Sequence, residues 1–142
     1  MEKYIVIEHT ADIGLKVLGN TKKELFINAA RGMFFLITGL SLDKKPFKKQ
    51  YLPVECSASG LEDLLVAWLN ELLFIHNTDF LFLNEFKIEC LTGNFLKSQV
   101  GGFRLKEFPC KINNEIKAVT YHNLNISKNN KKQWETSVIF DI

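Results

Sequence analysis

The stretch SGLEDLLVAWLNELLFIHNTDFLFLNEFKIEC (residues 59–90) changes its hydrophobic period once along its length. Up to Ile75, leucines and a tryptophan recur at helical spacing, which predicts one long amphipathic helix. Ser59 and Glu62 fit a capping box, in which side chains satisfy two N–H groups at the start of a helix. From residue 80 onward the period changes to the two of a strand, as Phe86, Ile88 and Cys90 show. We therefore expect long helices and strands in the same chain.

The residues before this stretch predict two strands and a first helix. Residues 3–8 and 13–18 are apolar or alternate between apolar and polar, which favours strands. A second capping box, formed by Thr21 and Glu24, is placed to begin a helix. Gly39 is placed to end that helix, because glycine readily takes the left-handed conformation found after many helices.

Further strands complete the pattern. Val54 and Cys56 share one face of a short strand, and turn-forming clusters separate several alternating segments after residue 91. The order β-β-α-β-α followed by strands predicts an α+β fold, with two main helices packed on one face of a largely antiparallel sheet. A length of 142 residues fits a single domain, residues 1–142.

The charge of the chain is small, because 18 lysines and arginines stand against 16 aspartates and glutamates, a formal net charge of +2. A protein that binds nucleic acid over its whole surface usually carries a larger excess. We therefore expect any contact with RNA to be indirect or confined to a local patch. The local candidates are the lysines of the 44–49 loop and a second group at Lys128, Lys131 and Lys132, although solvated loops are the ordinary alternative.

Cysteine use and the start of the chain indicate a cytoplasmic protein. Cys56, Cys90 and Cys110 are odd in number and form no CxxC pair, so we expect neither a disulfide framework nor a zinc knuckle. The first residues, MEKYIVIEHT, lack the unbroken apolar stretch of a signal peptide. No apolar run approaches the roughly 18 residues of a membrane span, so we expect no membrane contact.

Two places in the sequence offer oxygen ligands for a metal. Asp12 lies in a polar insertion, HTAD, between two apolar segments, and Asp141 stands beside the α-carboxylate of Ile142. Hard cations such as Ca²⁺ and Mg²⁺ bind carboxylate and carbonyl oxygens. The alternatives are a turn in which Asp12 bonds nearby N–H groups and a frayed, solvated chain end.

A third place of interest is IKAVTYH, residues 116–122. Lys117 alternates with apolar neighbours, so its ordinary interpretation is a solvated lysine on a strand. His122 falls on the predicted face of Ala118 and Leu124, which favours a partly buried, hydrogen-bonded histidine over a catalytic base. The sequence contains no glycine-rich phosphate loop, GxSxG or HExxH motif, so these residues alone name no reaction.

Taken together, these segments resemble the archease family. The resemblance runs through essentially the whole chain, with its motifs in the family's order. It rests on HTADIG at 9–14, ELF at 24–26 with AA at 29–30, LLVAWLNELL at 64–73, IKAVTYH at 116–122, and the final pair Asp141 and Ile142.

The resemblance implies an archease-like α+β fold and a non-enzymatic role in tRNA splicing. Archeases act as cofactors of the RtcB-type RNA ligase, whose GTP- and metal-dependent guanylylation they promote and whose multiple turnover they permit. Matched by position, the family's metal site falls on Asp12, Asp141 and Ile142, with Ca²⁺ as the expected ion and Mg²⁺ or Mn²⁺ as alternatives. Lys117 matches the lysine implicated in ligase activation.

Two other functions stay open at this point. One is a chaperone or specificity factor for a tRNA methyltransferase, a role also attached to the family. The other is a metal-dependent hydrolase that uses Asp12, Asp141 and His9, although no nucleophile occurs at a recognisable spacing. One position departs from the family: Gly102 stands where an acidic residue is common, which would weaken metal or partner binding if that residue contributes to either.

Overall fold

The computed structural model describes residues 3–8, 12–41, 49–104, 106 and 112–142. Their helices and strands follow the predicted order, two strands and a helix, then a strand, a helix and a series of strands. In chain order they are β1 (Tyr4–Glu8), β2 (Asp12–Gly19), α1 (Lys22–Thr38), β3 (Gln50–Ser57), α2 (Leu61–Asp79), β4 (Leu81–Leu91), β5 (Phe95–Arg104), β6 (Ala118–Thr120), β7 (Ser127–Lys128) and β8 (Trp134–Asp141).

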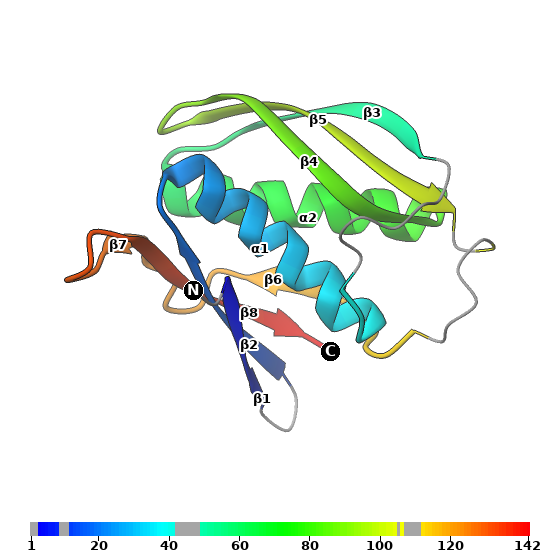
Figure 1. Cartoon of the computed structure of the whole chain (residues 1–142), viewed down its shortest axis with the longest axis horizontal. Coiled ribbons are helices and arrows are strands. Elements are labelled where there is room, and N and C mark those ends of the chain that lie inside the picture. Colours follow the sequence, from blue (N-terminus) through cyan, green and yellow to red (C-terminus); the bar gives the residue numbers. More distant parts are fainter. Residues whose placement is uncertain (1–2, 9–11, 42–48, 105, 107–111) are drawn as a thin grey trace.

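The strands form two sheets, and the helices lie between them (Figure 1). One sheet has the order β1-β2-β8-β6, with β7 also paired to β8, and the other has the order β3-β5-β4. All pairings among the described strands are antiparallel. The α+β class and the two helices are therefore confirmed, but the expectation of one sheet with helices on one face is corrected to two sheets.

The burial of α1 explains why one sheet is not enough. No residue from Leu25 to Thr38 is exposed, so this helix is enclosed nearly all round. A helix with apolar side chains on more than one face must be covered on more than one side. The helix α1 packs against β2 on one side and β4 on the other, and Trp68 of α2 donates a hydrogen bond to the carbonyl of Phe26 at 3.0 Å.

The ends of α1 match their prediction. The backbone N–H of Glu24 donates to Thr21 Oγ1 at 3.1 Å, which is the expected cap of the first turn. Gly39 has φ 73° and its N–H donates to the carbonyl of Phe35 at 2.7 Å, so it ends the helix in the left-handed conformation.

The predicted capping box of Ser59 and Glu62 is wrong. Gly60 occupies the N-cap of α2 and supplies no side chain. The Ser59 hydroxyl instead donates to a carboxylate oxygen of Asp63 at 2.6 Å. Glu62 is engaged elsewhere, because one of its carboxylate oxygens accepts the backbone N–H of Ile126 at 3.1 Å.

The last strand of the chain lies inside its sheet rather than at an edge. β8 pairs with β2 along its whole length, with Trp134 opposite Gly19 and Asp141 opposite Asp12. On its other side β8 pairs with β6 near one end and with β7 near the other. β6 is short, and the chain turns after Thr120, so His122 is exposed rather than partly buried as expected.

Two of the three cysteines lie in the part of the chain that the structure describes. Cys56 is buried and Cys90 half-buried, both as free thiols, while Cys110 lies outside the described residues. Burial, together with the charge of Glu71, raises the pKa of the Cys56 thiol to about 11. Within the described part of the chain, neither helix is both long and apolar enough to cross a membrane.

Candidate functional site

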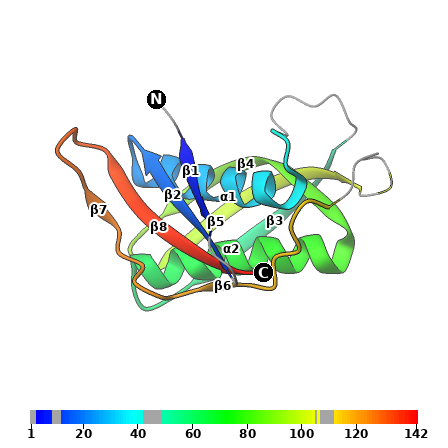
Figure 2. The same cartoon turned by 90° about the horizontal axis from the view of Figure 1, so that it is seen from below.

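Strand register brings the predicted site residues to one end of the five-stranded sheet. Asp12 of β2 lies directly opposite Asp141 of β8, and Asp141 lies directly opposite Ala118 of β6. The backbone N–H of Lys117 donates to the carbonyl of Asp141 at 2.8 Å. In Figure 2 the chain ends beside β6 at this end of the sheet. Asp12, Asp141, Ile142 and Lys117 therefore come from three segments that meet side by side.

Alternation along the strands places both carboxylates on the same face. The next row of the sheet, Ile13, Phe140 and Val119, is buried in the core at 4%, 0% and 4% exposure. Successive side chains of a strand point to opposite faces, so Asp12 and Asp141 lie on the face away from the helices. A slip of one residue would drive carboxylates into the core, which fixes this register.

The surroundings of Asp12 favour a cation. Its Oδ1 atom is buried and has no hydrogen-bond partner among the described residues. A buried carboxylate oxygen without a partner is unfavourable, and a second carboxylate directly opposite adds like-charge repulsion. The Asp141 side chain, in contrast, is exposed. A bound divalent cation would satisfy the Asp12 oxygen and remove the repulsion at once.

The donor set is small. The described residues contain no group of three or more His, Cys, Asp and Glu side chains that could hold a metal ion. Besides Asp12 and Asp141, further oxygens would have to come from the α-carboxylate of Ile142, from backbone carbonyls or from water, all of which Ca²⁺ accepts. His9, the third residue of the hydrolase hypothesis, lies outside the described residues.

Lys117 is exposed, as the sequence predicts. The described part of the chain offers no carboxylate within ion-pairing distance of its amine. Its backbone is nevertheless fixed by the bond to Asp141, so a flexible side chain starts from a well-defined position. Such a lysine can deliver a point charge to a phosphate or an acidic group on a partner.

Asn70 of α2 supports this site, and sequence reasoning assigned it no role. Its Oδ1 accepts the backbone N–H of Val119 at 3.1 Å, and its Nδ2 donates to the carbonyl of Val119 at 3.5 Å. One side chain thus pairs with both backbone groups of β6 that face α2, as a neighbouring strand would. In the sequence, the sign of this role was that Asn70 is a polar residue next to Leu69 in a leucine-rich helix.

Gly102 does not belong to the carboxylate site. It lies in β5, in the other sheet, opposite a register shift between Leu83 and Glu85. A Cβ atom at this position would lie only 2.8 Å from Leu83 Cα and closer still to the carbonyl oxygen of Phe82. The backbone of β4 therefore leaves no room here for an acidic side chain.

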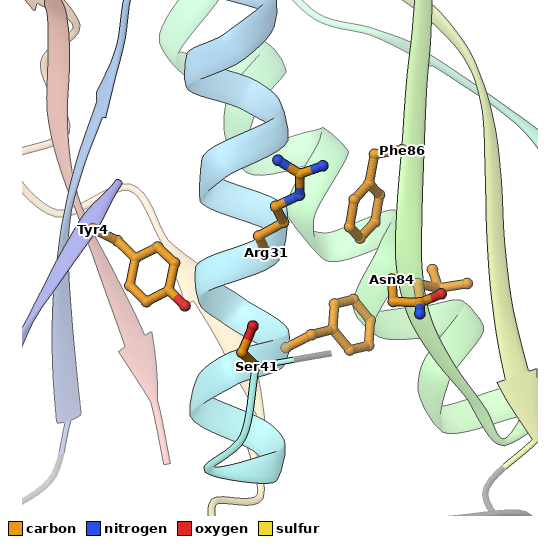
Figure 3. A pocket seen from close by; sticks show the side chains of 7 residues that line it. Tyr4, Arg31, Ser41, Asn84 and Phe86 are labelled. Carbon is orange, nitrogen blue, oxygen red and sulfur yellow. The ribbon is translucent and has the colours of Figure 1, made fainter. Parts of the chain in front are cut away.

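A small gap lies between β1, α1 and β4. Figure 3 shows Tyr4 from β1, Arg31 from α1, and Asn84 and Phe86 from β4 around this gap. Its volume is about 10 Å³, which is room for at most about one water molecule. This gap is too small for a substrate or cofactor.

Comparison with known proteins gives one consistent result. The archease protein family (MTH1598/TM1083) matches residues 4–142. "Protein archease" of Pyrococcus furiosus is 32% identical over 145 residues, with 100% of both chains covered. "Protein archease" of Methanosarcina acetivorans is 36% identical over 146 residues, covering 99% of this chain and 97% of the relative.

Two solved structures share the fold. The solution structure of Methanobacterium thermoautotrophicum protein 1598 has a TM-score of 0.76 and 32% identity, with both chains fully covered. A Thermotoga maritima crystal structure, described as an archease and possible chaperone, has a TM-score of 0.63 and 28% identity, covering 96% of this chain and 94% of that one.

Proposed function

Because the chain belongs to the archease protein family, we propose that it is a non-enzymatic, metal-binding cofactor of an RtcB-type RNA ligase. In this role it promotes the GTP-dependent guanylylation of the ligase and permits multiple turnover in tRNA splicing, in the cytoplasm. The observation that carries the proposal is the direct opposition of Asp12 and Asp141, with a buried, unpartnered Asp12 oxygen and Lys117 bonded alongside.

Each residue has a part in this proposal. Asp12, Asp141 and the α-carboxylate of Ile142 hold a divalent cation, with Ca²⁺ favoured by the all-oxygen donor set and Mg²⁺ or Mn²⁺ as alternatives. The cation supplies positive charge that offsets the clustered carboxylates and ties β2 to the end of β8. Lys117 then presents its amine to a phosphate or acidic group of the ligase.

The decisive test is a guanylylation assay with GTP and a ligase from the same source, with and without this protein. We expect faster guanylylation when the protein is present and no turnover of GTP or RNA by the protein alone. Unchanged guanylylation at saturating protein would refute the activator role. Turnover of GTP or RNA without ligase would instead support the hydrolase.

Lys117→Ala tests the assigned role of the amine. The variant should lose most activation while its stability changes by no more than about 0.5 kcal/mol, because the side chain is exposed. Lys97→Ala, an exposed lysine of β5 in the other sheet, is the matched control and should activate like the parent. Equal activation by the two variants would remove Lys117 from the mechanism.

A second role, as chaperone or specificity factor for a tRNA methyltransferase, is favoured by the description of the Thermotoga maritima relative as a possible chaperone. Adding the protein to such a methyltransferase should then change its tRNA specificity or solubility. An effect there without any effect on ligase guanylylation would make this the better assignment.

A further inference from the structure

The β7–β8 hairpin carries a concentrated group of lysines. Lys128, Lys131 and Lys132 are exposed, and the hairpin projects from the rest of the molecule (Figures 1 and 2). Its tip is well defined, because Asn129 Oδ1 accepts the backbone N–H groups of Lys131 and Gln133 at 2.9 and 3.0 Å. The lysines are therefore presented on an ordered support.

More positive charge gathers at the base of this hairpin. The amines of Lys22 and Lys128 lie 4.9 and 5.4 Å from the centre of the Trp134 ring. Six lysines stand near this end of the molecule, together with carboxylates that include Glu24, Glu62 and Glu135, in a chain whose net charge is only +2. We call this group the hairpin lysines; it comprises Lys16, Lys22, Lys23, Lys128, Lys131 and Lys132.

A polar hollow of about 170 Å³ lies next to Lys16, on the face of the β2–β8 pair that carries Glu135 and Ser137. Thr136 contributes backbone to its lining, while its side chain, only 4% exposed, faces the core beside Val17 on the other side of the strand. The negative charge of the Glu135 carboxylate is balanced by the Lys16 amine 3.9 Å away. The carboxylate can therefore accept a hydrogen bond from a ligand hydroxyl without leaving an unbalanced negative charge. The other polar side chains around the hollow are Asn123, Asn125, Ser127 and Ser137.

This combination fits a sugar-phosphate chain. Lysine, serine and asparagine are among the side chains that contact phosphate and sugar in nucleic-acid complexes, and ribose 2′-hydroxyls both donate and accept hydrogen bonds. We propose that single-stranded RNA binds here through its backbone, with one ribose in the hollow and neighbouring phosphates on the hairpin lysines. The choice of RNA over other polyanions rests on the proposed function; the placement rests on the hollow and the lysines.

The RNA surface is separate from the carboxylate site. Gly19 faces Trp134 at the hairpin end of the β2–β8 pair, and Asp12 faces Asp141 at the other. At about 3.3 Å per residue, the two ends lie roughly 23 Å apart. The hollow, at Lys16 and Ser137, lies four residues, or roughly 13 Å, from Asp12 and Asp141 on the same face of the sheet, so RNA in the hollow would run beside that site without using its residues.

The test measures binding of a labelled uridine homopolymer by fluorescence anisotropy, without ligase or GTP. Lys128→Gln, Lys131→Gln and Lys132→Gln are combined in one variant. A matched variant with the same loss of charge combines Lys87→Gln, Lys97→Gln and Lys106→Gln, which are exposed positions outside the five-stranded sheet. At about 50 mM salt we expect the hairpin variant to bind at least about tenfold more weakly, and its log–log salt slope to fall by about 2.

The hollow is tested separately with Asn125→Ala combined with Ser137→Ala. The parent should bind RNA more tightly than the corresponding DNA, and this double variant should lose the preference while keeping its salt slope. Equal affinity for RNA and DNA in the parent would overturn the ribose placement. Equal weakening by the two lysine variants, or equally effective competition by polyglutamate, would overturn the RNA surface. None of these results bears on the activator role, because guanylylation of the ligase is measured with GTP in the absence of RNA.

Discussion

Replacing Asn70 by alanine should detach the short strand β6 from α2 and disturb the carboxylate site without touching any of its proposed ligands. The substitution removes the bonds of 3.1 and 3.5 Å to the backbone of Val119, a residue only 4% exposed. An unsatisfied buried backbone group costs about 1–3 kcal/mol. For a chain of this size that corresponds to a fall in Tm of about 3–10 °C.

The matched control is Asn77→Ala on the exposed side of the same helix. Both substitutions change helix propensity by the same few tenths of a kcal/mol, so their difference isolates the bonds to Val119. Thermal unfolding gives the stability, and hydrogen exchange at the Val119 amide gives the local effect, which should be lost protection. Ligase activation should fall as well, because Lys117 directly precedes β6 and its position depends on that strand. Equal Tm and equal Val119 exchange in the two variants would refute this reasoning.

Three further outcomes follow from the structure. Asp12→Asn should weaken Ca²⁺ binding at least about tenfold by calorimetry, since one charged ligand of the few available is neutralised; undiminished binding would remove Asp12 from the site. A tag fused after Ile142 converts its α-carboxylate to an amide and should lower metal affinity and activation, whereas the same tag at the other end of the chain should not; equal behaviour would make the terminus a bystander. The pKa of the Cys56 thiol is raised to about 11, so its thiolate is scarce at pH 8. Alkylation of Cys56 should therefore be about 100-fold slower in the folded than in the unfolded chain. Comparable alkylation rates in the two states would contradict the burial of Cys56.

Local patterns predicted local structure well. Residue spacing alone was enough to predict the cap at Thr21, the helix end at Gly39 and the first strands. The interactions that cause these features lie within a few residues of each other. The Ser59 cap failed because Glu62 bonds the backbone of Ile126, far along the chain, and Gly60 could take the cap position instead. His122 was misplaced because alternation in the sequence continues beyond the point where β6 ends.

The division into two sheets and the support from Asn70 depended on tertiary contacts that spacing does not reveal. Composition alone could not distinguish a helix covered on one side from α1, which is covered on two. For the candidate site, the family resemblance suggested Asp12, Asp141, Ile142 and Lys117, and the register of β2, β8 and β6 brings these residues together. Asn70 escaped notice because a single polar residue on a leucine-rich helix has many ordinary explanations.

The central position of β8 has a consequence for how the protein is made. Every neighbour of β8 is synthesised before it, so during translation β2, β6 and β7 wait without their shared partner. Contacts between residues so far apart in sequence form late and slowly, and unpaired strand edges invite association with other chains meanwhile. The three-stranded sheet β3-β5-β4 has no such dependence and can form as soon as β5 emerges. A nascent chain would thus acquire one sheet early, while its carboxylate end is assembled only when the ribosome has nearly finished, so truncated products would lack that end altogether.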